Sequence, residues 1–136
     1  MKPRVLLLMA ALAAASPASA HHSVAMFDQG RLTILKGVVK SFSFVNPHSW
    51  ISIVGSTDGA GEAVRWDVEA TSPSTLARLG LTGDALKPGD RVTVAIRPLL
   101  DGRHGGSMVF VIGQDGKRYG ADPQDLGLSQ RALTPR

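Results

Sequence analysis

Patterns typical of β-strands recur through the middle of the chain, and the clearest of them covers residues 64–70. There, from Val64 to Glu69, apolar residues alternate with charged ones. This period of two predicts a strand with one buried face and one face toward solvent. Runs of β-branched and aromatic residues predict further strands over 32–45, 50–54, 92–96 and 108–112, and a brief return of the chain near Tyr119.

The pattern changes after the third predicted strand. Thr71 or Ser72 can cap a helix, Pro73 suits its first turn, and Gly80 suits its end. The sequence therefore predicts one short helix over 73–79, between the third and fourth strands.

Glycine and proline mark the places where the predicted strands bend or stop. Gly37, near the middle of the first strand, predicts a bend or a bulge. The segment Asn46–Pro47–His48 separates the first two strands, because proline has no N–H to donate to a ladder. Residues 99–106 are polar and rich in glycine, which predicts a loop between the fourth and fifth strands.

This order of elements predicts the fold class. Three strands, a short helix and two more strands fit an all-β domain with one short helix, built as a five-stranded OB-like Greek-key barrel. A β-sandwich is the rival, and it would need about seven strands. We expect the barrel to occupy residues 31–120, between an N-terminal arm over 21–30 and a loosely ordered C-terminal tail over 121–136.

The first 20 residues have the composition of a signal peptide. Residues 1–4 are a basic start, residues 5–15 are an apolar run, and Ala18–Ser19–Ala20 supplies the small residues that signal peptidase recognises. The apolar run is shorter than the roughly 20 residues that a helix needs to span a bilayer, which disfavours a membrane anchor. We expect cleavage after Ala20, a periplasmic or secreted mature chain, and no membrane span after cleavage.

Charge and composition exclude several classes of function. Without Lys2 and Arg4, the 15 basic residues fall to 13 against 11 acidic ones, and no basic run with interleaved aromatics occurs, so no nucleic-acid partner is expected. The chain has no cysteine, which excludes disulfides and thiolate metal ligands. Asp67 and Glu69 are interpreted as a solubilising strand face. Because no hydrolase or phosphate-loop motif occurs, we expect no enzyme activity and no catalytic residue.

The four histidines are the residues most suited to chemistry. His21 and His22 stand at the expected mature terminus, His48 lies between the first two strands, and His104 precedes the fifth. A terminal His21 can chelate a metal through its α-amine and ring Nδ1, because an amine pKa near 7.7–8.0 lets a metal displace the proton. A third nitrogen from His22, His48 or His104 would complete a planar site that suits Cu(II). Copper is the one cofactor that the sequence suggests.

Such a site places demands on the fold. The loops that carry His48 and His104 flank one ligand-binding face in an OB-type barrel. The first strand would separate the arm from His48 by roughly 43 Å if it were straight, so the strand must bend and the arm must fold back. Met26 and Met108 can offer soft thioether ligands to Cu(I), but both are more simply explained as core residues.

Other functions fit the same sequence. The histidines have a simpler explanation as a solvated arm, a tight turn and an exposed loop. Without a metal, the exported barrel would be an envelope interaction module that binds a peptide, a glycan or a protein partner. A small copper redox enzyme is a third alternative. The sequence carries no signature of an oligomeric state.

Several motifs give the chain a resemblance to a known family. They are His21–Asp28 (His-His-Ser-Val-Ala-Met-Phe-Asp), Asn46–Pro47–His48, Ser72–Pro73 with Leu76, and Leu86–Asp90. In these motifs the chain resembles an uncharacterised family of small exported bacterial proteins, classed as a domain of unknown function. The resemblance covers about residues 21–120. It supports the domain boundaries and directs attention to the histidines, and it implies no activity.

Overall fold

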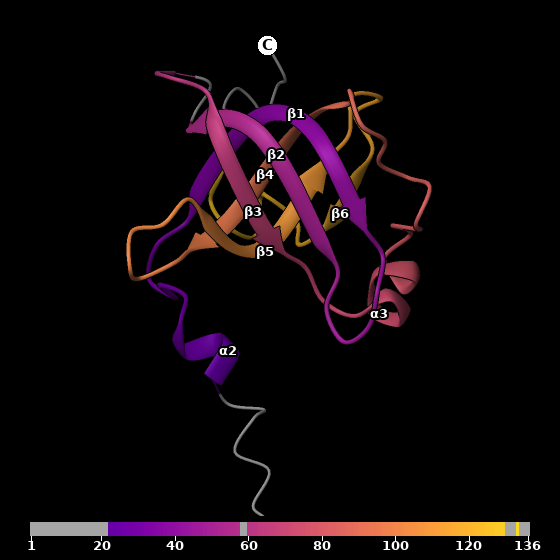
Figure 1. Ribbon diagram of the computed structural model, residues 1–136, viewed down its shortest axis with the longest axis horizontal. Coiled ribbons are helices and arrows are strands. Elements are labelled where there is room, and N and C mark those ends of the chain that lie inside the picture. Colours follow the sequence, from indigo (N-terminus) through magenta and orange to yellow (C-terminus); the bar gives the residue numbers. More distant parts are fainter. Residues whose placement is uncertain (1–21, 58–59, 130–132, 134–136) are drawn as a thin grey trace, which may run out of the picture.

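A computed structural model describes residues 22–57, 60–129 and 133, and its centre is a β-barrel (Figure 1). Helix α3 (Pro73–Arg78) lies between β3 and β4 in the chain, and a single helical turn, α2 (His22–Ala25), precedes β1. The strands are β1 (Thr33–Ser43), β2 (Trp50–Thr57), β3 (Val64–Glu69), β4 (Arg91–Pro98), β5 (Gly105–Ile112) and β6 (Arg118–Gly120).

The barrel is closed by one parallel pairing. The strands pair in the order β3-β2-β1-β4-β5-β6, and β3 also pairs with β5, which joins five strands into a ring. The other strand pairs are antiparallel, and β6 lies outside the ring as an extra strand beside β5. The predicted all-β fold with one short helix and a five-stranded OB-like barrel is therefore confirmed.

Strand β5 begins at Gly105, so part of the predicted loop over 99–106 is in fact strand. Gly105 lies opposite Asp67 of β3 in the parallel pairing. A Cβ atom on Gly105 would lie 2.9 Å from the Asp67 carbonyl oxygen, and one on Gly106 would lie 2.5 Å from that of Arg97. Glycine permits this close approach of backbones, whereas a sequence pattern interprets the same glycines as a loop signal.

Strand β1 carries a bulge, but the bulge is not at Gly37. Its register against β2 shifts between Val39 and Ser41, which places the extra residue at Lys40. Gly37 instead lies opposite Gly55 of β2, where a Cβ atom would lie 2.4 Å from a backbone oxygen. The paired glycines let the two strands approach closely as they curve together around the barrel (Figure 1).

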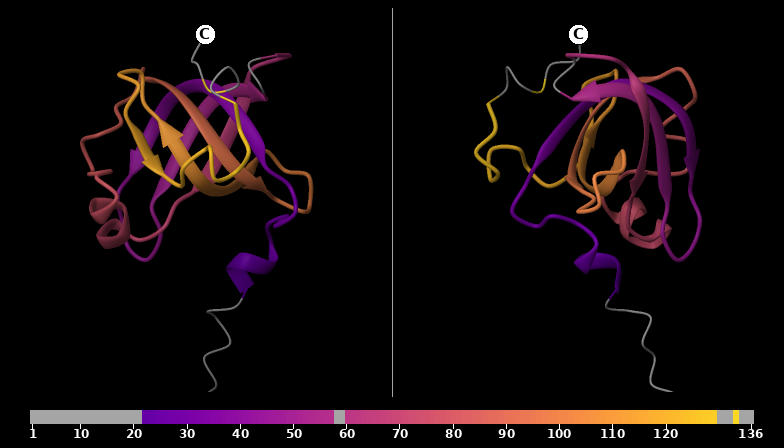
Figure 2. Two further views of the ribbon diagram at one scale, coloured as in Figure 1. Left: turned by 180° about the vertical axis from the view of Figure 1, so that it is seen from behind. Right: turned by 60° about the vertical axis from the view of Figure 1, so that its left-hand side comes forward.

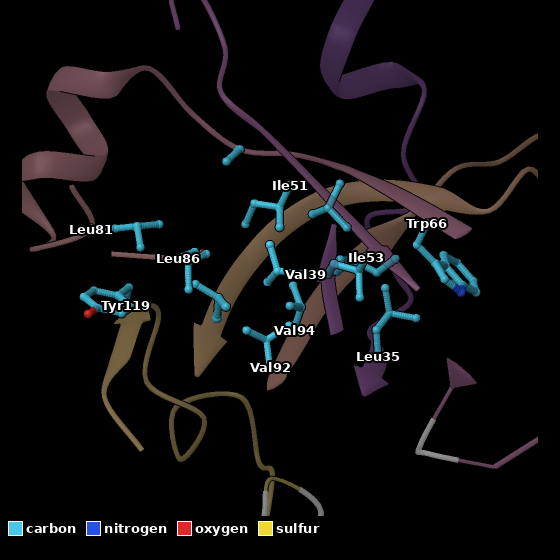
Figure 3. Close-up of a cluster of buried hydrophobic side chains, with 14 of the residues drawn as sticks. Leu35, Val39, Ile51, Ile53, Trp66, Leu81, Leu86, Val92, Val94 and Tyr119 are labelled. Atoms are coloured by element: carbon cyan, nitrogen blue, oxygen red, sulfur yellow. The ribbon is translucent and has the colours of Figure 1, made fainter. Parts of the chain in front are cut away.

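The barrel interior holds the main hydrophobic core (Figure 3). Trp66 and Val68 of β3 are buried in it whereas Arg65 and Asp67 are exposed, which confirms the two predicted faces of that strand. Leu76 of α3 is fully buried in the same core, so the helix covers one end of the barrel. The other buried members are Leu35, Val39, Ile51, Ile53, Ala70, Leu81, Leu86, Val92, Val94, Ile96, Val111 and Tyr119.

A second apolar cluster lies on the outer face of the barrel. Side chains of β1, β4 and β5 meet residues of the C-terminal segment there, and this segment crosses the outside of the barrel in Figure 2. The buried members are Ile34, Ala95, Phe110, Ile112 and Leu133, with Leu126 and Leu128 partly buried beside them. The segment after β6, which has no periodic pattern in the sequence, thus contributes apolar contacts to the barrel wall.

The ends of α3 follow the predicted signals. Ser72 is the N-cap, and its hydroxyl accepts a hydrogen bond from the Thr75 N–H. The helix ends at Arg78, one residue before the predicted end, and Gly80 follows with a φ of +83°. Glycine adopts this left-handed conformation without steric cost, which ends the helix.

The expected signal peptide and the cleavage point after Ala20 lie outside the described residues. Within those residues, no helix is both long enough and apolar enough to cross a membrane.

Candidate functional site

His48 lies against Glu69, and backbone hydrogen bonds hold the two together. The Nδ1 atom of His48, in the loop between β1 and β2, contacts Oε1 of Glu69, the last residue of β3. The Ser49 N–H donates to the Thr71 carbonyl over 3.2 Å, and the Ala70 N–H donates to the Ser49 carbonyl over 2.8 Å. The position of His48 is therefore set by the barrel.

This contact leaves one ring nitrogen of His48 for a ligand. The His48 side chain is 42% exposed, and that of Glu69 is 16% exposed. Because the carboxylate contacts Nδ1, Nε2 is the nitrogen that can bind another group. A carboxylate that orients a histidine in this way is the usual partner of a metal-binding imidazole.

His48 and Glu69 line a cavity of about 290 Å³, which we call the His48 cavity. Its walls come from the N-terminal arm, the end of β3, the end of α3, and strands β5 and β6, and they are mainly apolar. The remaining lining residues are Val24, Phe27, Ala70, Thr71, Leu79, Ser107, Met108, Val109 and Gly120. The cavity therefore combines one imidazole and one carboxylate with a largely apolar surround.

The second half of the N-terminal arm is attached to the barrel beside this cavity. Phe27 is buried and forms an isolated bridge with Leu99. The Asp28 N–H donates to the Pro98 carbonyl over 2.8 Å, and the Leu100 N–H donates to the Met26 carbonyl over 2.9 Å. These contacts fix residues 26–28 of the arm to the turn after β4, whereas α2 projects from the barrel (Figure 1).

His104 has a different partner. Its ring lies against Trp66, with ring centroids 4.9 Å apart and an interplanar angle of 45°. The His104 carbonyl accepts a hydrogen bond of 3.2 Å from the Asp67 N–H. His104 is thus held at the junction of β3 and β5, where it covers an aromatic core residue.

His104 lines a second cavity of about 340 Å³, which we call the His104 cavity. Phe27 and Glu69 line both cavities and so stand between them. The His104 cavity has more charged walls than its neighbour. Its other lining residues are Met26, Trp50, Asp67, Leu99, Arg103, Gly105 and Gly106.

The loop beside the His104 cavity is organised by a carboxylate. The Arg103 N–H donates to Asp101 Oδ1 over 3.0 Å, and Arg103 Nε donates to Oδ2 over 2.7 Å. These two bonds hold the pKa of Asp101 below its ordinary value, and the bond from the backbone N–H has the larger effect. Asp101 therefore carries a negative charge that offsets the nearby Arg103.

The structure brings the candidate ligands together only in part. His48 and His104 line adjoining but separate cavities. Among the described residues, no three histidine, aspartate or glutamate side chains are grouped so that they could hold a metal ion. His21 and the side chain of His22 lie outside the described residues. The arm residue Val24 nevertheless lines the cavity of His48, so the chain near the expected mature terminus lies at that cavity.

Two residues of the site, Glu69 and Phe27, are not predicted as site residues from the sequence, which indicates a solubilising strand face for Glu69. Met108 is considered from the sequence as a thioether ligand for Cu(I), although a core position is its simpler explanation. Glu69 ends a predicted strand next to a helix cap, but this placement alone does not indicate a site. No local pattern identifies its partner, since His48 lies on another strand connection.

A family model matches residues 9–108 of the chain, and it describes a family of unknown function (DUF6152). The matched segment includes the arm, both histidines that the structure describes fully, and Met108. No curated protein and no solved structure matches the chain.

Proposed function

The chain belongs to this family of unknown function, and on that premise we propose that it is an exported barrel that binds copper through its processed N-terminus. The observation that carries the proposal is the His48–Glu69 pair in a cavity that the N-terminal arm also lines. We propose a periplasmic or secreted location and a role in holding or delivering the metal, without catalytic turnover.

The reach of the arm supports a site that includes the mature terminus. A chain cut after Ala20 would begin at His21, only three residues before Val24. Three residues span at most about 11 Å, so the new amine would remain close to the cavity that Val24 lines. The amine and the ring Nδ1 of His21 would then supply two nitrogen ligands.

The His48–Glu69 pair supports His48 as the third nitrogen. Its Nδ1 is occupied by the carboxylate, which orients the ring and leaves Nε2 for a ligand. One amine and two imidazoles form a nitrogen-rich set, and such a set prefers Cu(II) among the common divalent metals. His104 is the less suitable third ligand, because its ring lies against Trp66.

Titration of the processed chain with Cu(II) tests the proposal. Three proteins are compared: the chain that starts at His21, the same chain with one glycine ahead of His21, and the His21→Ala chain. We expect one-to-one binding by the first and at least about 100-fold weaker binding by the other two, since each loses a chelate nitrogen. Equal affinity in all three would exclude a site built on the free terminus.

A second candidate function has its own support. Val24, Met26, Trp50 and Leu100 are all exposed apolar residues, and Met26 and Trp50 line the His104 cavity. A metal-free envelope interaction module would use this surface to bind a peptide, a glycan or a protein. Absence of any measurable copper binding by the correctly processed chain would favour this function over the first.

A further inference from the structure

The His48 cavity contains a thioether as well as an imidazole. Met108 of β5 lines the same cavity as His48 and Glu69. It is also packed, partly buried, against the main core. Its side chain is therefore held by a strand of the barrel and is not a surface methionine free to move.

A β-bulge in β5 affects how this strand meets the cavity. Ala95 of β4 pairs with Phe110, and Ile96 pairs with Met108, so Val109 is an extra residue on β5. Both Met108 and Val109 line the cavity, while Met108 also packs against the main core and Val109 against the outer cluster. Bulges redirect side chains next to functional sites, and here the bulge lies beside the imidazole of His48.

The surroundings of Met108 suit a soft cation of low charge. Val24, Phe27, Leu79 and Val109 supply apolar walls, and the single carboxylate of the cavity is already paired with His48. Thioether sulfur and imidazole are good ligands for Cu(I), and an apolar surround costs a monocation less than a dication.

We infer that the His48 cavity also holds Cu(I), with the Met108 sulfur and His48 Nε2 as ligands. The inference rests on the proposed function in that it assigns a second oxidation state of copper to the same cavity. It concerns binding alone and includes no electron-transfer step. The soft ligand of this site, the Met108 thioether, would thus come from β5.

Separate measurements of the two copper ions in two methionine variants test this inference. Met108→Leu removes the sulfur at nearly constant volume, a change that costs a core less than about 1.5 kcal/mol. Met26→Leu is the matched control, because Met26 lines the His104 cavity instead. The processed chain and both variants are titrated with Cu(I) under anaerobic conditions against a chromogenic Cu(I) chelator, and with Cu(II) in a separate competition assay.

We expect Met108→Leu to weaken Cu(I) binding about tenfold or more, with Cu(II) binding changed by less than about threefold, and Met26→Leu to change neither. X-ray absorption of the Cu(I) form should show a Cu–S distance in the unmodified chain and in Met26→Leu. This second readout does not depend on how Met108→Leu folds.

The two proposals fail in different ways. No Cu(I) binding by the unmodified chain, or Cu(I) affinity and Cu–S scattering that are unchanged by Met108→Leu, would overturn the thioether ligand. If the unmodified processed chain binds Cu(I) but not Cu(II), the proposed terminal site is overturned. Cu(I) binding that is weakened by Met108→Leu would still support the thioether ligand in that case.

Discussion

His48 and His104 lie in adjoining cavities that share Phe27 and Glu69 as common walls, yet their rings have different partners. His48 contacts the carboxylate of Glu69, whereas His104 lies against the indole of Trp66. A carboxylate at one ring nitrogen prepares the other for a ligand, while an aromatic face offers a packing contact. Both histidines are candidate metal ligands in the sequence, but the contacts of their rings give them different roles. Residues of the N-terminal arm line both cavities.

The largest expected effect is the difference between replacing His48 and replacing His104 by alanine. His48→Ala should weaken Cu(II) binding by the processed chain about 100-fold or more, because a nitrogen ligand is lost. His104→Ala should change the affinity by less than about threefold. The measurement is a competition titration, with circular dichroism to show that both variants are folded. A larger loss in His104→Ala than in His48→Ala would reverse the comparison.

The shared wall provides the next test. Phe27→Ala removes a buried aromatic ring that fastens the arm, which costs about 2 kcal/mol of burial. We expect up to about 30-fold weaker Cu(II) binding, because the terminus is no longer held near His48. Hydrogen exchange should show faster exchange of the Asp28 and Leu100 amides, whose bonds join the arm to the barrel. Unchanged exchange at these amides would show that Phe27 does not fasten the arm.

A smaller effect is expected from the carboxylate that orients His48. Glu69→Gln keeps the shape of the side chain and removes its charge, so Cu(II) affinity should fall about tenfold. Asp67→Asn is the matched control, since Asp67 lies two residues earlier on the same face of β3 and pairs with Arg65. The two variants should share one melting temperature within a few degrees. Equal copper affinities in both would argue against a positioning role for Glu69.

The smallest effect concerns pH and the loop of the His104 cavity. The pKa of Asp101 is lowered by hydrogen bonds from Arg103. These bonds therefore stabilise the folded state fully at a pH above the ordinary pKa of an aspartate, and this stabilisation is lost as the pH falls through the lowered pKa. Arg103→Ala should raise the pKa of Asp101 part of the way back, because the backbone N–H of residue 103 still donates. NMR titration of the Asp101 carboxyl measures this, and a pKa that does not rise would remove the guanidinium from the explanation.

The parts of the fold that could be predicted from the sequence are those with local causes. The alternation from Val64 to Glu69 and the cap at Ser72 act within a few residues, and both are present in the structure. The start of β5 could not be predicted in this way, because Gly105 pairs with Asp67 of β3, which is distant in the sequence. A glycine that serves closure between distant strands has the same local appearance as a glycine in a loop.

In the candidate site, too, only the residue with a local signal could be predicted from the sequence. His48 could be singled out because histidine is rare in this chain and follows the strand break at Pro47. Glu69 could not, because its role depends on a residue of another strand connection, brought close by pairing of β2 with β3. Met108 lines the cavity next to a bulge at Val109, and no glycine or proline signals this bulge in the sequence.

The ring of strands has one short joint. β3 and β5 meet only through Asp67–Glu69 and Gly105–Ser107, and Glu69 and Ser107 both line the His48 cavity. An ion bound by both His48 and Met108 would connect the chain near the end of β3 with β5 across this short pairing. Its binding energy would then oppose opening of the whole barrel, so that the stability of the fold would report the presence of the metal.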